Sequence, residues 1–109
     1  MIVITNRIKV KKGMGAVMAP AFTAPGPLDT FKGFSKVEVL VGNFDDYDEM
    51  NVNMYWDDME SFMAWRNSDA FRAAHKRPEP GSKEAEQESA ILGSEIITYE
   101  VAAVKDVTK

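Results

Sequence analysis

The sequence predicts an α+β fold in which one four-stranded antiparallel sheet carries two helices on a single face. Four segments alternate between apolar and polar residues with the two-residue period of half-buried strands. Two other segments repeat apolar residues at helical spacing, and the order along the chain is strand, helix, strand, strand, helix, strand. A length of 109 residues with 45% hydrophobic content suffices for one core, so we expect a single domain over residues 1–109.

A strand and a short helix are expected at the start. Residues 2–10 alternate, and one face of this segment holds Ile2, Ile4, Ile8 and Val10. Asn6 falls in the same apolar row. Apolar residues then recur at helical spacing over residues 14–22, but Gly15 and Pro20 disfavour a regular helix there. We therefore expect a short or kinked helix.

A loop and a hairpin are expected next. Residues 23–33 are rich in Pro and Gly, which is typical of a loop. Valines at positions 37, 39 and 41 predict the second strand, and the alternation over residues 51–56 predicts the third. We expect the acidic connection over residues 42–49 to be a solvated turn of a hairpin.

The second helical region is expected to have two segments. Asp57 and Glu60 have the spacing of a capping box at the start of a helix. Ser68 is a good N-cap for a second segment that continues to His75, and Pro78 ends it.

The remaining residues complete a ferredoxin-like pattern. Residues 78–90 are polar and acidic and predict a loop, and residues 95–104 predict the last strand. A sheet covered by helices on one face leaves the other face bare, with Val3, Thr5 and Arg7 on it. Because a mixed apolar face of this kind tends to be buried between two copies, we expect a homodimer.

Composition excludes several classes of function. The net charge of -4 argues against a nucleic acid partner, because phosphates repel an acidic surface. The absence of cysteine excludes disulfides, thiolate metal sites and cysteine nucleophiles, and favours a cytoplasmic location. No run of about 18 apolar residues is present and the start has no signal-type segment, so we expect no membrane association.

Asn6 is the first candidate functional residue. A side-chain amide in the apolar row of a strand costs about 1–3 kcal/mol if its hydrogen bonds are not made. A backbone group or a bound water satisfies such an amide more often than a ligand does. Asn6 is therefore either a satisfied core residue or a ligand contact.

The run FMAWRNSDAFRAAHKRP over residues 62–78 holds Trp65 and the only histidine, His75. A lone histidine near a helix end more often interacts with the helix dipole or solvent than with a metal. The usual zinc ligand sets cannot be assembled within one such chain, whereas a haem iron needs only one protein ligand. Trp65 has the spacing of a core residue, or it lines a cavity with His75. The basic residues of this run are either solvated or receive ligand carboxylates.

These residues resemble a known family. Asn6 in the first strand, Trp65 in the run SFMAWRNSDAFRAAHK and His75 ten residues on resemble the Asn, Trp and His triad of the Isd-type haem-degrading monooxygenases. That family lies within the dimeric ferredoxin-like superfamily of proteins similar to antibiotic biosynthesis monooxygenases. The segments NRIKVKKG, TFKGF and IITYEV also match, so the resemblance covers nearly the whole chain. Pro20 and the segment APGP over residues 24–27 depart from it, because a more polar first helix is expected in the family.

The resemblance implies a dimeric α+β barrel with one haem per subunit, where haem is both cofactor and substrate. It implies that His75 is the axial ligand of the iron, that Asn6 hydrogen-bonds at the distal oxygen ligand, and that Trp65 distorts the porphyrin. The residues implied to bind haem are Asn6, Phe22, Trp65, Phe71 and His75. With O2 and electrons from an external reductant or reductase, the ring is opened and iron is released.

Two alternatives remain open on the sequence alone. The first is a haem-binding or storage protein that uses the same pocket without turnover. The second is a cofactor-free quinol monooxygenase on the related dimeric fold. Loss of the haem absorption band with ascorbate and O2 would distinguish turnover from storage, and a quinol monooxygenase would not bind hemin at all.

Overall fold

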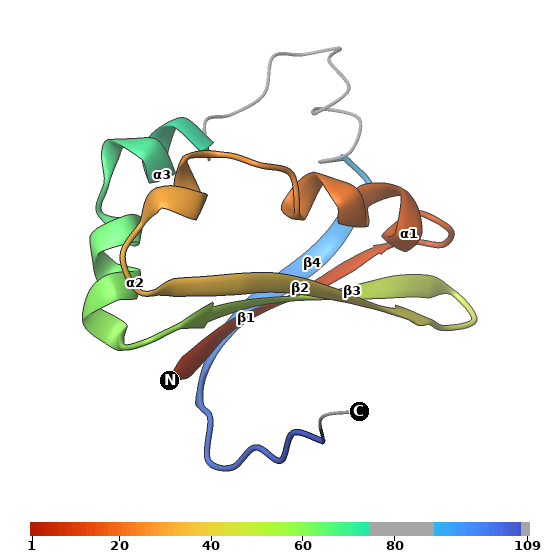
Figure 1. The fold of residues 1–109 in the computed structure, drawn as a ribbon. Helices are drawn as coiled ribbons and strands as arrows, with labels where there is room; N and C mark the ends of the chain where they lie inside the picture. Colours follow the sequence, from red (N-terminus) through yellow and green to blue (C-terminus); the bar gives the residue numbers. More distant parts are fainter. Residues whose placement is uncertain (75–88, 108–109) are drawn as a thin grey trace.

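The computed structural model describes residues 1–74 and 89–107, and its centre is a four-stranded antiparallel sheet with the strand order β2-β3-β1-β4. The strands are β1 (Ile2–Lys11), β2 (Phe34–Asn43), β3 (Tyr47–Trp56) and β4 (Ile91–Glu100). The helices are α1 (Gly15–Met18), the 3-10 turns η1 (Ala19–Phe22) and η2 (Pro27–Thr30), α2 (Met59–Arg66) and α3 (Asp69–Ala74). In the described part of the chain these helices lie on one face of the sheet (Figure 1). The predicted ferredoxin-like fold is confirmed.

The central strand β1 directs the predicted apolar row toward the helices. Ile4, Ile8 and Val10 are buried, and Asn6 lies between the first two of them in the same row. In the antiparallel register Asn6 is opposite Val52 of β3 and Ile96 of β4. Residues that are opposite each other in such a register point to the same face of the sheet. Asn6, Val52 and Ile96 therefore all face the helical layer.

The core is divided into two clusters, and Asn6 marks the division along β1. One cluster includes Ile4 with the two buried tryptophans, Trp56 and Trp65. The other is built from Ile8, Val10, Met18, Met50, Val52 and Ala90. Asn6 therefore places a polar amide between two apolar clusters.

The first helix is broken where the sequence predicts a kink. The α-helical turn α1 ends at Met18, and η1 continues as a 3-10 turn with Pro20 in its first turn. The start of α1 is fixed by Asp48, whose Oδ2 accepts hydrogen bonds from the backbone N–H groups of Gly13 and Gly15, at 3.0 and 3.1 Å. Asp48 is 2% exposed, so the prediction that it belongs to a solvated turn was wrong.

The α2 helix begins one residue later than predicted. Its N-cap is Asp58, whose carboxylate accepts a hydrogen bond of 2.8 Å from the backbone N–H of Ser61, and not Asp57. The backbone N–H of Asp57 instead donates to the carbonyl oxygen of Gly33, at 2.8 Å. Gly33 has a φ of +86°. A β-carbon there would also collide with the Ser61 side chain, so the turn before β2 requires glycine.

The bounds of β2, β3 and β4 differ from the predicted ones. Strands β2 and β3 extend further toward each other, and only residues 44–46 separate them. The last strand begins at Ile91 and ends at Glu100, so residues 101–104 do not continue it. Most of the loop predicted over residues 78–90 lies outside the described residues.

Candidate functional site

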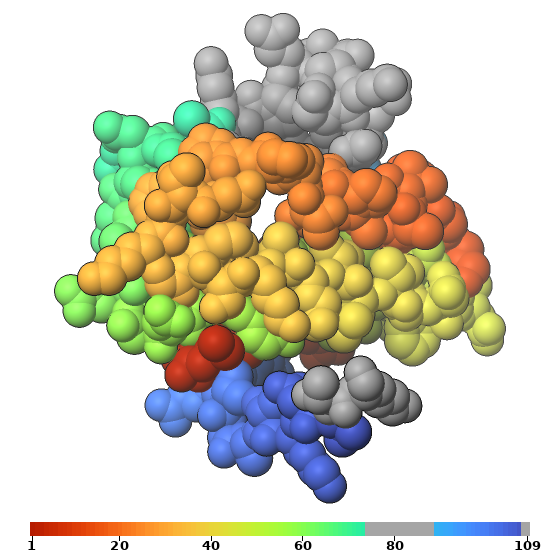
Figure 2. All heavy atoms as spheres, in the orientation of Figure 1, coloured from red at the N-terminus to blue at the C-terminus, as the bar shows by residue number. Residues whose placement is uncertain are grey.

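A cavity of about 310 Å³ lies between the sheet and the helical layer. Figure 2 shows a hollow between the orange segment that carries η2 and the yellow strand β2. Its lining comes from all four strands and from most of the helical segments: Ile4, Asn6, Phe22, Leu28, Val37, Val52, Met54, Phe62, Trp65, Arg66, Phe71 and Ile96. Aliphatic and aromatic side chains dominate this lining, as is typical of sites for small organic ligands.

The floor of the cavity is formed by side chains in register on adjacent strands. Asn6 on β1 and Ile96 on β4 both line it, and Ile96 is 70% exposed. The Oδ1 atom of Asn6 is buried and has no hydrogen-bond partner among the residues that the structure describes. A buried amide oxygen without a partner costs free energy, so this position favours a ligand that donates a hydrogen bond or brings a polar atom to it.

One wall of the cavity is the indole of Trp65, which is 5% exposed. Its ring centroid lies 5.1 Å from that of Phe31 at an interplanar angle of 77°, and 5.6 Å from that of Phe71 at 86°. Two edge-to-face contacts hold an indole firmly, because each opposes rotation of the ring out of its packed position. Trp65 is therefore a rigid wall.

The turn between α2 and α3 positions both Trp65 and Phe71. The hydroxyl of Ser68 donates to the carbonyl oxygen of Trp65 at 2.6 Å and accepts from the backbone N–H of Phe71 at 3.1 Å. The predicted N-cap role of Ser68 is confirmed. By ending one helix and starting the next, this serine brings two aromatic residues six positions apart against the same cavity.

Four of the five residues predicted to bind haem line this one cavity. Asn6, Phe22, Trp65 and Phe71 come from β1, η1, α2 and α3 and meet there. His75 lies outside the described residues and is the residue that follows α3 in the sequence. The roles assigned to these residues stay predictions.

Eight of the twelve described lining residues were not among those predicted to bind haem, and three of them show why. Ile96 is opposite Asn6 in the register, so pairing the first and last strands would have identified it. Leu28 lies in the segment interpreted as an irregular loop, which gives no periodic signal. Arg66 was noted only as one of several basic residues, and its place beside Trp65 on α2 brings it to the cavity.

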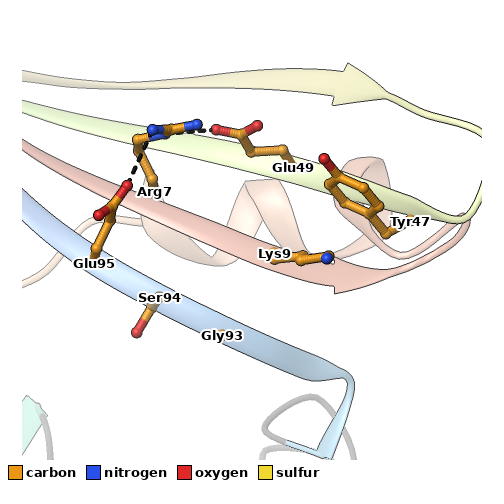
Figure 3. Close-up of a pocket in the computed structure, with 7 residues that line it drawn as sticks. All are labelled: Arg7, Lys9, Tyr47, Glu49, Gly93, Ser94 and Glu95. Carbon is orange, nitrogen blue, oxygen red and sulfur yellow. Dashed lines mark hydrogen bonds and ion pairs between the residues drawn. The ribbon is translucent and has the colours of Figure 1, made fainter.

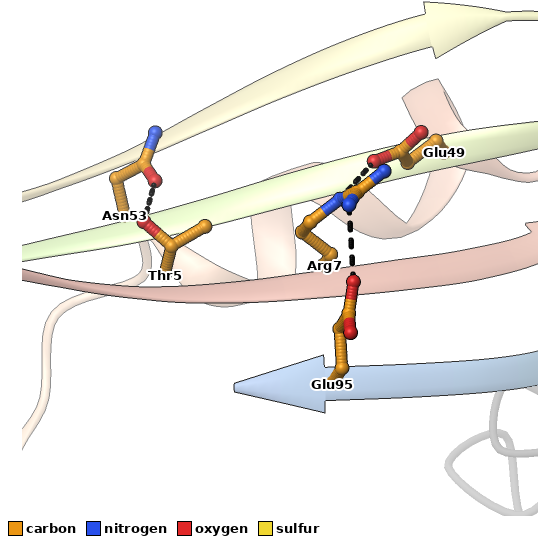
Figure 4. A network of polar contacts seen from close by, with 5 residues as sticks. All are labelled: Thr5, Arg7, Glu49, Asn53 and Glu95. Atoms are coloured by element: carbon orange, nitrogen blue, oxygen red, sulfur yellow. Dashed lines mark hydrogen bonds and ion pairs between the residues drawn. The ribbon is translucent and has the colours of Figure 1, made fainter. Parts of the chain in front are cut away.

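The opposite face of the sheet has a different character. A second hollow of about 300 Å³ lies there, and charged and polar side chains dominate its lining (Figure 3). Arg7 bridges Glu49 and Glu95 across three strands, at 2.9 and 3.0 Å (Figure 4). The hydrogen bond and the charge of Glu49 are the main reasons why the pKa of Arg7 is raised. These charges satisfy one another, so this hollow is a weaker candidate for a catalytic site.

A second polar network lies further along the same face. The hydroxyl of Thr5 donates to Oδ1 of Asn53 at 2.7 Å, as Figure 4 shows. Glu38 accepts hydrogen bonds of 3.3 Å from both Asn53 and Tyr55. Desolvation and then the negative charge of Glu38 raise the pKa of Tyr55. The face predicted to be mixed and apolar is thus more polar in its centre than the sequence suggests.

Residues 1–77 match the antibiotic biosynthesis monooxygenase family. The chain belongs to this family. Over 102 residues it is 45% identical to a protein of Staphylococcus saprophyticus named "heme oxygenase (staphylobilin-producing)", and the match covers 93% of this chain and 95% of that protein. It is also 36% identical over 106 residues to the "heme-degrading monooxygenase" of Bacillus thuringiensis, which covers 96% of this chain and 94% of that protein. The resemblance stated from the sequence is confirmed.

The fold of this family member is also found in a solved structure. The haem degrader MhuD of Mycobacterium tuberculosis, solved with two haems in its active site, superposes with a TM-score of 0.70 at 20% identity. The superposition covers 97% of this chain and 100% of MhuD. Within the described residues, no helix of this family member is long and apolar enough to span a bilayer.

Proposed function

We propose that this chain is a haem-degrading monooxygenase that binds haem in the cavity between β1 and the α2–α3 unit. Haem is both its cofactor and its substrate. With O2 and electrons from an external donor, the enzyme opens the porphyrin ring to a bilin and releases the iron. Relatives 42% to 46% identical carry a staphylobilin-producing name, which supports a product of the staphylobilin class.

The observation that carries the proposal is the side-chain amide of Asn6, whose oxygen has no partner among the described residues, in an apolar, aromatic cavity. Apolar walls would fit the faces of a porphyrin, and the amide would supply a polar group in an otherwise apolar interior. The described lining therefore suits the chemistry of haem. When bound, haem would supply both the iron that reduces dioxygen and the ring carbon that is oxidised.

Asn6 would orient the reacting oxygen without supplying a proton. Its amide N–H donates a hydrogen bond, and the neutral amide does not give up that proton near neutral pH. Acid-assisted cleavage of an O–O bond requires a group that does transfer a proton, such as an imidazolium or a carboxylic acid. An amide at this position thus favours attack on the ring over peroxidase-like chemistry.

Trp65 would press on the face of the macrocycle. Because Phe31 and Phe71 hold the indole from two sides, it cannot easily turn away when a flat ligand enters. A flat ligand held against this wall would be distorted, which would favour oxidation of the ring.

His75 is proposed as the axial ligand of the iron. The resemblance supports this role, and so does its place in the sequence directly after α3, whose Phe71 lines the cavity. A neutral imidazole is the most common protein ligand of haem iron. Substitution of His75 by Ala should abolish the iron-dependent spectrum of bound hemin.

A homodimer that uses the open face of the sheet is part of the proposal. Leu40 and Tyr99 are 52% and 50% exposed, and their strand partners Asn51 and Val3 place them on that face. Oδ1 of Asn51 is buried there without a partner among the described residues. Exposed apolar side chains beside a buried acceptor of this kind favour contact with a second copy of the chain. A molecular mass near 24 kDa in solution, twice the 12.2 kDa of the chain, would support this, and a monomer at all concentrations would contradict it.

We also place the reaction in the cytoplasm, where an external reductase or small reductant would supply the electrons. The lack of cysteine is consistent with this compartment.

The deciding experiment is a hemin titration followed by ascorbate and O2 in the presence of catalase. A shifted Soret band that disappears on reduction, with a bilin product and chelatable iron, is expected. A Soret band that persists would indicate binding without turnover, and no spectral shift on adding hemin would contradict haem binding altogether.

A further inference from the structure

We infer that Arg66 binds a substrate carboxylate at the mouth of the cavity and thereby fixes the orientation of the macrocycle. This inference rests on the proposed function, because it concerns the two propionate groups that distinguish one edge of haem from the others. Arg66 is not among the residues that the resemblance implies to bind haem.

The polarity of the lining sets Arg66 apart. Among the described residues that line the cavity, only Asn6 and Arg66 are polar, and only Arg66 is charged. Asn6 lies on the floor, between the two clusters of the core. Arg66 is exposed although it lines the cavity, so its guanidinium lies where the cavity meets solvent. A ligand that fills the apolar interior and keeps carboxylates in water would present them at this position.

The guanidinium of Arg66 is available for such a contact. Within residues 1–74 and 89–107 it makes no ion pair, whereas Arg72 on α3 pairs with Asp69. A planar guanidinium matches a carboxylate with two parallel N–H···O contacts, which gives direction as well as attraction.

The backbone that carries Arg66 is well fixed. Trp65 precedes it and is buried between two aromatic rings, and the carbonyl oxygen of Trp65 accepts a hydrogen bond from Ser68. The side chain of Arg66 thus starts from a defined point at the end of α2, next to the wall formed by the indole. An anchor at this point sets which edge of the ring lies outward and, in consequence, which ring carbon approaches Asn6.

The segment from α1 to η2 offers no cation at the described cavity. The segment from α1 to η2 contributes only Phe22 and Leu28 to the described lining, and both are apolar. Residues 14–30 contain no Lys or Arg at all. Among the described residues that line the cavity, Arg66 is therefore the one that can attract a carboxylate by charge.

The test compares hemin with its dimethyl ester, in which both propionates are uncharged. Binding is measured without reductant, by quenching of tryptophan fluorescence and by the Soret band, so that no turnover occurs. The wild-type chain should bind hemin about tenfold more tightly than the ester, as expected for one charge-assisted contact near solvent. Arg66→Leu should remove this preference by weakening hemin binding alone, and Arg66→Lys should retain part of it.

Arg72→Leu is the matched control, because it removes an exposed arginine that does not line the cavity. It should keep the wild-type preference for hemin. An Arg66→Leu variant that weakens hemin and the ester equally, or changes neither, would overturn the inference while leaving haem binding intact. A wild-type chain that does not bind hemin would refute the proposed function, and the inference with it.

Discussion

The hydroxyl of Ser68 donates a hydrogen bond to the carbonyl oxygen of Trp65, with 2.6 Å between the two oxygen atoms. The same hydroxyl oxygen caps the next helix by accepting from the backbone N–H of Phe71. One small side chain thus sets the angle between α2 and α3 and the edge-to-face contact of the two aromatic residues.

Replacing Ser68 by Ala should lower the free energy of unfolding by about 1 kcal/mol, because the cap of α3 is lost. Hemin affinity should fall as well, since Trp65 and Phe71 would no longer be held at the cavity wall. Urea unfolding and a hemin titration measure the two effects. Ser68→Thr keeps the hydroxyl and should stay closer to wild type in both, and an Ala variant as stable as wild type would contradict the role of the cap.

Replacing Asn6 by Leu should separate stability from activity. The change removes a buried oxygen that has no partner among the described residues, so the free energy of unfolding should stay the same or rise by about 1 kcal/mol. Ring opening should be lost. The matched control is Asn53→Leu, which breaks the 2.7 Å hydrogen bond with Thr5 and should destabilise the chain. If Asn6→Leu destabilises as much as the control, the amide of Asn6 is satisfied in the folded protein.

Replacing Trp65 by Phe should slow ring opening by about tenfold while hemin still binds, because a smaller ring presses less on the ligand. The product is measured by bilin absorbance in single-turnover experiments. Trp56→Phe is the control, since Trp56 is fully buried in the same cluster but does not line the cavity. It should lower stability and leave turnover per folded molecule unchanged. Equal losses of turnover in both variants would argue against a specific role for Trp65.

The N-cap of α2 predicts a pH dependence of stability. The hydrogen bonds from Ser61 to Asp58 hold the pKa of this carboxyl below its ordinary value of 3.8. Because the folded state binds this proton less readily, the stabilisation is complete above the ordinary pKa and is lost as the pH falls through the folded-state pKa.

Asp58→Ala should therefore be less stable than wild type at neutral pH, and the difference should shrink as the pH falls below the ordinary pKa. Urea unfolding of both proteins across the acidic range measures this. A difference that does not change with pH would show that the carboxylate charge contributes nothing to the cap.

Much of the fold follows from local sequence signals. The apolar rows of β1 and β3, the interruption of the first helix at Pro20 and the cap at Ser68 each depend on neighbouring residues, so they were predictable. The burial of Asp48 depends on contacts that are distant in sequence, and there the prediction was wrong. Asp48 belongs to an acidic run, yet it is buried. The backbone N–H groups of Gly13 and Gly15, in the segment that follows β1, donate hydrogen bonds to its carboxylate.

The candidate site was predictable only in part. Asn6 was found because an amide interrupts an apolar row, and Trp65 because of a family resemblance that covers nearly the whole chain. Ile96 was missed, and Arg66 was considered only as one of several basic residues that are solvated or receive ligand carboxylates. Their relation to the cavity depends on how α2 and β4 pack against β1, which no local pattern encodes.

Gly33 couples two segments that surround the ligand. Its carbonyl oxygen accepts from the backbone of Asp57, and its lack of a side chain lets Ser61 pack directly against it. The turn that follows η2 and the first turn of α2 are therefore joined by a backbone hydrogen bond and by direct packing. The segment that carries Leu28 and the helix that carries Trp65 are thus tied to each other at one end of the cavity, so the spacing between these two walls is set before a ligand enters.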